Sequence, residues 1–190
     1  MLNSINALFN HPTARKIFLT LRIPLVLVLV ALVAHYARTE LMCAGFAVSM
    51  FGQAIQLWSF ASLVKNEQLT ARGPYVLVRN PMYLGRYFLI LGFVVVTGSV
   101  WAVVAYTLFY WFYMDNRVRR EETRLVQLLG APYRAYCERV RRFLPNLLKL
   151  GDPAVRFFNV GVMRNNNGHW NLLATLLAWA ALYGYRHYLA

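Results

Sequence analysis

Residues 72–85, RGPYVLVRNPMYLG, separate two long apolar runs and bring glycine, proline, tyrosine and arginine together. Gly73-Pro74 and Asn80-Pro81 both break regular structure. Pro81 suits the first position of a new helix, which Asn80 would cap. The free backbone N–H groups and the positive dipole end of that helix would lie beside Arg79 and favour a carboxylate or phosphate. A membrane-interface loop anchored by arginines explains the same residues equally well.

The composition indicates a membrane protein. Of the 190 residues, 59% are hydrophobic, whereas soluble domains contain about 45–50% apolar residues. The net charge of +13 would also suit a nucleic-acid partner, but the arginines flank apolar runs on one side, so we expect a membrane and no nucleic acid. The two cysteines, Cys43 and Cys137, and the scattered histidines form no ligand pattern, and no metal site is predicted.

Five apolar segments predict an all-α, polytopic membrane bundle of about five transmembrane helices with a catalytic subdomain on the cytoplasmic side. The segments are roughly 17–36, 41–64, 82–96, 100–113 and 170–189. The first lacks a small-residue cleavage site and is expected to be a retained span that Pro24 kinks or delimits. Basic residues gather at the first end, in the second loop and from 117 to 164, so the positive-inside rule places the N-terminus and the polar segments in the cytoplasm.

Three parts are expected along the chain: a two-helix hairpin (1–64), a cofactor-binding catalytic region (65–145) and a C-terminal segment with the fifth span (146–190). The fourth span continues as a helix to Leu129, where Gly130 can end it, and Pro132 then starts an interfacial amphipathic helix. Small residues of the second span would allow a neighbouring helix to approach closely. These are Gly45, Ala47, Ser49, Gly52 and Ala54, and beside them Gln53 and Gln56 are expected to serve packing rather than a site.

A second polar group, Arg117-Val118-Arg119-Arg120-Glu121-Glu122, follows the fourth span. Arg117 and Glu121 are four residues apart and share a helix face, so a solvated helix end with ion pairs explains these residues taken alone. Combined with residues 72–85, they offer an anion-binding loop, carboxylates for an amine or for ribose hydroxyls, and the rings of Tyr75 and Tyr83 for a purine or a sulfonium. This combination suits S-adenosylmethionine without excluding a nucleotide cofactor.

Over about residues 65–145 the chain resembles the integral-membrane methyltransferases, the group of isoprenylcysteine carboxyl methyltransferases and phospholipid N-methyltransferases. Each motif is weak alone, but their order is specific. The motifs are Gly73-Pro74-Tyr75, Arg79-Asn80-Pro81-Met82-Tyr83-Leu84-Gly85, Arg117 with Glu121-Glu122, Gly130-Ala131-Pro132-Tyr133-Arg134-Ala135-Tyr136, and Arg142-Phe143-Leu144-Pro145.

The resemblance implies S-adenosyl-L-methionine as cofactor and a lipid-like acceptor that enters from the bilayer. It implies catalytic roles for Arg117, on the substrate side, and Glu121. The implied cofactor-binding residues are Glu67, Gln68, Leu69, Thr70, Tyr75, Arg79, Asn80, Pro81, Tyr83, Glu121 and Glu122. Asn80 and Glu67 stand where the prenylcysteine enzymes have histidine, which argues against a prenylcysteine substrate more than against the cofactor.

Two other functions compete with the methyltransferase. Membrane sterol-type reductases that use NADPH resemble the same architecture, but they tend to place Asn directly before the motif tyrosine, where this chain has Met82. A non-catalytic membrane scaffold or lipid-binding protein explains the arginines and tyrosines as anchors, but not why two separated polar groups fit one cofactor. The methyltransferase is therefore favoured, while a phospholipid amine, a prenyl or fatty carboxylate and a small lipophile all stay open as acceptors, and the oligomeric state is not predicted.

Overall fold

The computed structural model describes residues 12–64 and 69–188, with residues 12–22 described as backbone alone. Within these ranges the chain is helical and contains no strand, which confirms the all-α prediction. The α-helices are α2 (Pro12–Tyr36), α3 (Met42–Ser62), α4 (Pro81–Val95), α5 (Val100–Leu129), α6 (Ala131–Arg139), α7 (Val160–Asn165) and α8 (Gly168–Tyr188). Short 3₁₀ helices are Thr39–Leu41, Gly73–Val76, Leu147–Lys149 and Pro153–Arg156.

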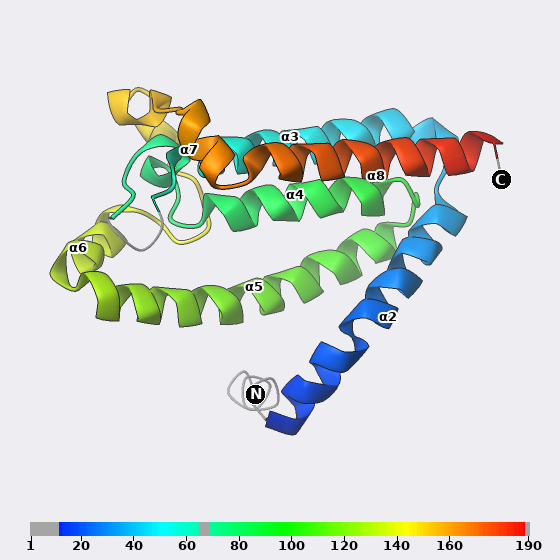
Figure 1. The fold of residues 1–190 in the computed structure, drawn as a ribbon, viewed down its shortest axis with the longest axis horizontal. Helices are drawn as coiled ribbons and strands as arrows, with labels where there is room; N and C mark the ends of the chain where they lie inside the picture. The colour runs from blue at the N-terminus through cyan, green and yellow to red at the C-terminus, as the bar shows by residue number, and fades with distance from the viewer. Residues whose placement is uncertain (1–11, 65–68, 189–190) are drawn as a thin grey trace.

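The helices form a bundle in which α3 packs against both α4 and α8. Figure 1 shows α3, α4 and α8 side by side, with α5 along the other side of α4 and α2 leaning away from the bundle. At one end α5 extends past α4 and turns into α6, beside the 3₁₀ segments and α7. The polar stretches that the sequence singled out meet at this end, which we call the polar end (residues 69–80, 115–146).

Glycines allow the backbones of α3 and α4 to pack in direct contact. A Cβ atom on Gly52 would lie 2.3 Å from the Leu89 nitrogen and 2.5 Å from the Gly85 oxygen. One on Gly45 would lie 2.6 Å from the Gly92 oxygen. No side chain fits at such distances, so the small-residue prediction is confirmed for this seam.

The same prediction is wrong for two of its five residues. Ala47 and Ala54 are exposed, whereas Gly45, Ser49 and Gly52 are buried. The reason is the helical period: positions 45, 49 and 52 share one face, and 47 and 54 lie on the opposite one.

Polar residues of α3 contribute to packing, as expected. Gln53 and Gln56 are 1% and 2% exposed, and the Thr175 hydroxyl of α8 donates a 3.0 Å hydrogen bond to Gln53 Oε1. Away from water, such a bond ties two helices together. Gln53 therefore belongs to the α3–α8 contact, whereas Gln56 lies in the α3–α4 seam, against Gly85.

Five membrane spans stay a prediction, although the five long helices are present. Among the described residues, only Thr39–Ser62 combines the length and apolar composition of a span, and Ile23–Tyr36 and Pro81–Val95 are shorter apolar helices. At 1.5 Å per residue the 15 residues of α4 cover about 22 Å, less than the about 30 Å of a bilayer core. The α2 helix continues through Pro24, and Leu189, the expected end of the last span, lies outside the described residues.

Apolar side chains nevertheless cover much of the outer surface. Leu27 and Val30 of α2 are 64% and 60% exposed, and Trp101 of α5 is 81% exposed. Apolar faces of this extent suit lipid rather than water. The structure is that of a membrane protein.

At the polar end the helix boundaries lie close to those predicted from the sequence. α5 runs unbroken to Leu129, and Gly130 ends it with a φ of 62°, a conformation that favours glycine. α6 then begins at Ala131, one residue before the expected Pro132, and buries Tyr133 and Tyr136 on one face. Between α6 and α8 the chain forms the 3₁₀ turns Leu147–Lys149 and Pro153–Arg156 and the short helix α7.

Candidate functional site

The loop before α4 begins at a tight glycine turn and is held further on by backbone hydrogen bonds. Gly73 has a φ of 60°, and a Cβ there would lie 2.1 Å from Ser62 Oγ, so the turn requires glycine. Further on, the Arg79 N–H donates to the Arg141 carbonyl at 2.9 Å, and the Asn146 N–H donates to the Leu77 carbonyl at 2.9 Å. Residues after α6 thereby hold the loop that leads into α4.

Asn80 occupies the N-cap position of α4 and Pro81 follows at the helix start, as predicted. The predicted side-chain cap is wrong. The Asn80 amide instead donates to Glu122 Oε1 at 3.4 Å and to the Arg142 carbonyl at 3.3 Å. A carboxylate and a carbonyl attract the amide N–H₂ group of Asn80, which a cap does not use. The carboxylate that reaches this helix start thus belongs to the protein itself.

Glu122 is the centre of a buried ion-pair cluster. It is 7% exposed, and its carboxylate accepts from Arg79 Nη1 at 3.0 Å and from Arg142 Nη2 at 2.5 Å. Arg142 also lies 3.6 Å from Asp115 Oδ1. The Nε atoms of Arg79 and Arg142 are buried and have no hydrogen-bond partner among the described residues. Two charged donors therefore have capacity left for an oxygen ligand.

Glu121 belongs to a different group, although it adjoins Glu122 in sequence. The Tyr83 hydroxyl donates to Glu121 Oε2 at 2.7 Å and accepts from Arg117 Nε at 2.9 Å. This hydrogen bond raises the pKa of Arg117. Arg117 and Glu121 are both exposed, and Tyr83 links them in place of the direct i,i+4 pair that the sequence suggested.

The remaining predicted residues lie apart from the carboxylates. Tyr75 is buried, its carbonyl accepts from the Tyr136 hydroxyl at 2.7 Å, and burial raises the pKa of Tyr75. Leu69 packs on the tyrosines of α6, and the Thr70 hydroxyl accepts from the Val64 N–H at 3.1 Å. Their cofactor-binding roles stay predictions. Glu67 and Gln68 lie outside the described residues.

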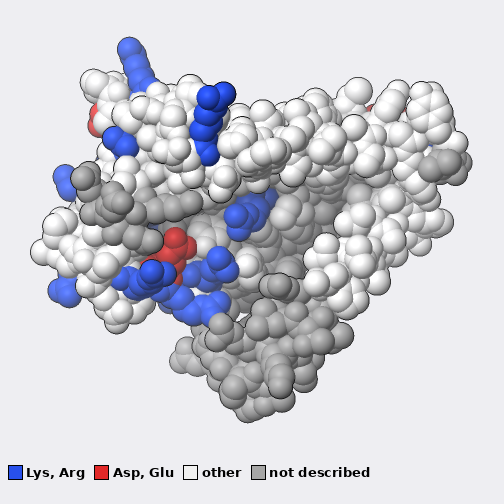
Figure 2. Space-filling view, in the orientation of Figure 1, with Lys and Arg blue, Asp and Glu red and all other residues white. Residues whose placement is uncertain are grey.

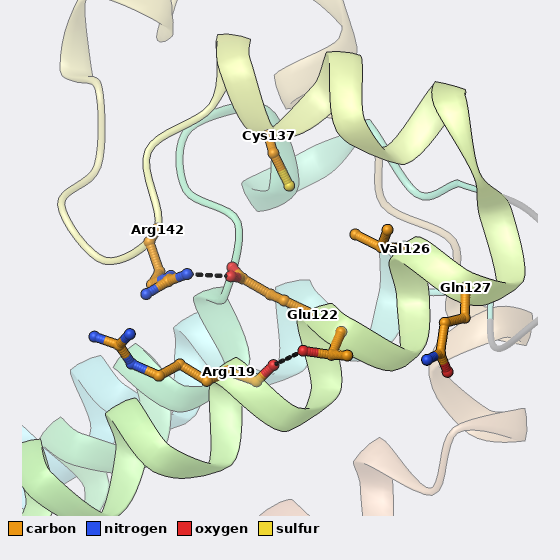
Figure 3. Close-up of a pocket in the computed structure, with 7 residues that line it drawn as sticks. Arg119, Glu122, Val126, Gln127, Cys137 and Arg142 are labelled. Carbon is orange, nitrogen blue, oxygen red and sulfur yellow. Dashed lines mark hydrogen bonds and ion pairs between the residues drawn. The ribbon is translucent and has the colours of Figure 1, made fainter. Parts of the chain in front are cut away.

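Two hollows adjoin the Glu122 cluster. An open recess of about 600 Å³ lies between α5 and α6, and Figure 3 shows Glu122 directed across it to Arg142. It is lined by Arg119, Glu122, Thr123, Val126, Gln127, Cys137 and Arg142. An apolar cavity of about 240 Å³ lies between α4 and α5, and Asn80 is one of its lining residues. Its other lining residues are Leu84, Tyr87, Thr107, Tyr110, Trp111, Met114, Phe143 and Leu144.

Charge is concentrated on the same side of the molecule. Figure 2 shows acidic side chains bordered by Lys and Arg on the hollowed face near α5 and α6.

Arg142 is a member of the Glu122 cluster that is not among the predicted site residues, although it belongs to the motif Arg142-Phe143-Leu144-Pro145. The signal that could have identified it is an arginine directly after the amphipathic helix, opposite an unmatched Glu pair.

A sequence model of one known family matches residues 26–131, which is more than half of the chain, and its description is phospholipid methyltransferase. The chain belongs to the phospholipid methyltransferase family. The matched range contains α3, α4 and α5, with Arg79, Asn80, Tyr83, Glu121 and Glu122. The family resemblance expected from the motifs is thus confirmed.

Individual relatives are more distant. Protein-S-isoprenylcysteine O-methyltransferase of Xenopus laevis is 28% identical over 119 residues, covering 56% of this chain and 41% of the relative. The enzyme of that name from Schizosaccharomyces pombe is 30% identical over 81 residues, covering 43% and 34%. A probable one from Oryza sativa subsp. indica is 33% identical over 78 residues, covering 41% of each. The chain spans less than half the length of these relatives, and no solved structure matches it.

Proposed function

We propose that this chain is an integral-membrane methyltransferase that takes a methyl group from S-adenosylmethionine and transfers it to a lipid-like acceptor. The main support is that the two polar groups assigned to one cofactor, residues 72–85 and 117–122, contact each other in the structure. Arg79 and Asn80 from the loop before α4 bind Glu122, and Tyr83 from the first turn of α4 binds Glu121. The family supplies the methyl-transfer chemistry, and relatives named isoprenylcysteine O-methyltransferases favour a lipophilic acceptor.

The residues around Glu122 fit the proposed cofactor. The unpartnered Nε atoms of Arg79 and Arg142 suit its carboxylate. The recess adds an apolar wall at Val126 and a hydrogen-bonding amide at Gln127. Because both oxygens of Glu122 already bind arginines, we assign Glu122 the positioning of Arg79 and Arg142. The exposed Glu121 does not line this recess; bound to Tyr83, it is the carboxylate left for the cofactor's amine or ribose hydroxyls where the cofactor extends beyond the recess toward α4.

When bound, S-adenosylmethionine supplies a methyl group that its positive sulfur already activates. The protein's contribution is therefore alignment and exclusion of water. Arg117, kept charged beside Tyr83, would hold a carboxylate or phosphate of the acceptor. Methyl transfer would break the cofactor's sulfur–methyl bond, whose electron pair stays on the sulfur, and would join the methyl group to an oxygen or a nitrogen of the acceptor. Where that atom is an amine nitrogen, Glu121 would take its proton.

The proposal includes a membrane orientation. With the N-terminus and the polar end in the cytoplasm, the cofactor enters from water and the acceptor enters sideways from the bilayer. The basic residues of the polar end and the exposed apolar faces of α2 and α5 support this arrangement. The division into parts at 1–64, 65–145 and 146–190 is proposed with it.

Titration calorimetry of the detergent-purified chain with S-adenosylhomocysteine tests the cofactor. We expect micromolar binding that is lost in Glu121→Gln, and transfer of labelled methyl groups to added lipid that is lost in Glu121→Gln and Arg117→Ala. Both variants should keep the unfolding temperature of the parent. Binding of NADPH in place of S-adenosylhomocysteine, or normal turnover in both variants, would reject the proposal.

A further inference from the structure

Residues 144–150, LPNLLKL, form an exposed apolar segment after α6, at the polar end of the molecule (Figure 1). Leu148, in the 3₁₀ turn Leu147–Lys149, is 95% exposed, and Leu144, Leu147 and Leu150 are 69%, 66% and 52% exposed. Exposed leucines that occur singly are ordinary, but four within seven residues form a contiguous apolar surface, which marks an interaction site. We call residues 144–150 the leucine segment.

The backbone of the leucine segment is held in place by the rest of the fold. The Asn146 N–H donates to the Leu77 carbonyl at 2.9 Å, and Asn146 Oδ1 accepts from the Leu148 N–H at 3.2 Å. Beyond the segment, Val155 is buried in one cluster with Val76 and Leu77. Both ends are therefore tied to the loop before α4, and the leucines cannot turn inward without breaking these contacts.

The leucine segment continues an apolar surface that already faces lipid. The ring of Phe143, directly before the segment, lies 5.2 Å from the ring of Trp111. Trp111 belongs with Leu108 to the exposed apolar side chains of α5. Tryptophan is typical of the boundary between the bilayer and water. The lipid that covers α5 therefore reaches the point at which the leucine segment begins.

Basic residues surround the leucine segment. Residues 139–164 contain a single acidic residue, Asp152, and six basic ones: Arg139, Arg141, Arg142, Lys149, Arg156 and Arg164. The Lys149 ammonium donates to the Arg139 carbonyl at 3.0 Å, which keeps its charge beside the leucines. Leucines bordered by Lys and Arg suit an anionic lipid surface. A second copy of the chain would instead bring like charges together, which disfavours self-association here.

We infer that the leucine segment inserts into the surface of an anionic bilayer. Leu147 and Leu148 lie among the lipid chains, while Lys149 and the neighbouring arginines bind lipid phosphates. This anchor goes beyond the proposed methyltransferase and does not depend on it, because it requires neither cofactor nor acceptor. It fixes Arg142, two residues before Leu144, and with it the Glu122 cluster, close to the membrane surface.

Photolabelling of the unmodified full chain tests the anchor. The chain is reconstituted in phosphatidylcholine nanodiscs, with or without phosphatidylglycerol, that contain a phosphatidylcholine with a diazirine on its acyl chain. Trypsin cleavage after Arg142 and Lys149 releases residues 143–149, and cleavage after Arg134 and Arg139 releases residues 135–139 of α6 as the matched control. We expect at least about tenfold more adduct on 143–149 than on 135–139, located on Leu147 and Leu148 by fragmentation. Phosphatidylglycerol should raise this labelling at least about threefold.

One variant separates insertion from chance contact with lipid. Leu148→Gln should lower the labelling of Leu147 at least about threefold, because a polar side chain at the tip of the segment opposes insertion. Leu128→Gln is the control, since Leu128 is an exposed leucine of α5 outside the segment, and it should change the labelling of Leu147 less than about twofold. Unfolding temperatures of both variants should match that of the parent.

Three results would each overturn the anchor: equal labelling of 143–149 and 135–139, labelling that does not depend on phosphatidylglycerol, or an equal effect of the two variants. Amine cross-linking of Lys149 to Lys149 between chains, without lipid adducts, would identify a second copy as the occupant and overturn it as well. Titration with S-adenosylhomocysteine keeps the proposed function separate. Lipid labelling in a chain that does not bind S-adenosylhomocysteine would keep the anchor and reject the methyltransferase.

Discussion

α4 packs against its two neighbouring helices, α3 and α5, through different kinds of contact. Against α3 it packs through glycines, with backbone atoms in direct contact and no room for a methyl group. Against α5 it packs through tyrosines whose hydroxyls bind carbonyls and carboxylates, and a cavity of about 240 Å³ remains. Close steric fit gives one rigid arrangement, whereas hydrogen bonds and a cavity allow a ligand to take part. The α3–α4 seam thus acts as the platform, and the polar end with the α5 side carries the site.

The largest effect is expected at the platform. Gly52→Val places side-chain atoms where Leu89 and Gly85 backbone atoms already lie, so the helices must separate. We expect a loss of more than about 4 kcal/mol of unfolding free energy, or no folded protein. Unfolding of the detergent-solubilised chain by denaturant measures it. Gly184→Ala is the control, because a Cβ there meets nothing within 4 Å. Equal stability of the Gly52 variant and its parent would contradict a steric platform.

The next effect separates the two carboxylates of the site. Glu122→Gln leaves Arg79 and Arg142 without their shared counter-charge, so we expect a loss of about 3 kcal/mol in unfolding free energy. Glu121→Gln should cost less than about 0.5 kcal/mol, because Glu121 is exposed, yet it should abolish cofactor binding. Asp115→Asn, which weakens the more solvated pairs with Arg119 and Arg142, should cost at most about 1 kcal/mol. Denaturation and calorimetry on the same samples measure both quantities, and equal destabilisation by the two Glu variants would refute the division of roles.

The smallest effect concerns a single hydrogen bond of the polar end. Tyr136→Phe removes the donor to the Tyr75 carbonyl and should cost about 1.5 kcal/mol, while Tyr188→Phe, 79% exposed, should cost nothing measurable.

The same residue makes a pH prediction. Burial raises the pKa of Tyr136 above its ordinary value of about 10. The unfolded chain then loses this proton before the folded chain does, so the stability contribution is complete below about pH 10 and is lost as the pH rises above it. Unfolding midpoints measured between about pH 9 and 11 should fall less steeply in Tyr136→Phe than in the parent. A parallel fall in both proteins would show that Tyr136 does not titrate on unfolding.

Much of the helical framework could be predicted from the sequence because its signals are local. Pro81 at a helix start, Gly130 at a helix end and the apolar period along α5 each depend on neighbouring residues alone. The ordered motifs of residues 72–85 and 117–122 were likewise sufficient to indicate the family, because they are short and contiguous.

The arrangement of the site required the tertiary structure, because it depends on direction around a helix and on partners far along the chain. Glu121 and Glu122 are chemically identical neighbours, but about 100° of helical rotation turns one outward to Tyr83 and Arg117 and the other inward to Arg79. Asn80 matched a helix cap by its local pattern, and only the approach of Glu122 from 42 residues away shows that its amide is used elsewhere. The sequence by itself determined which helices form and which family they belong to, since these follow from local propensity and contiguous motifs. The packing of α4, α5 and the segment after α6 decided which charges are paired, and so which of them are left for ligands.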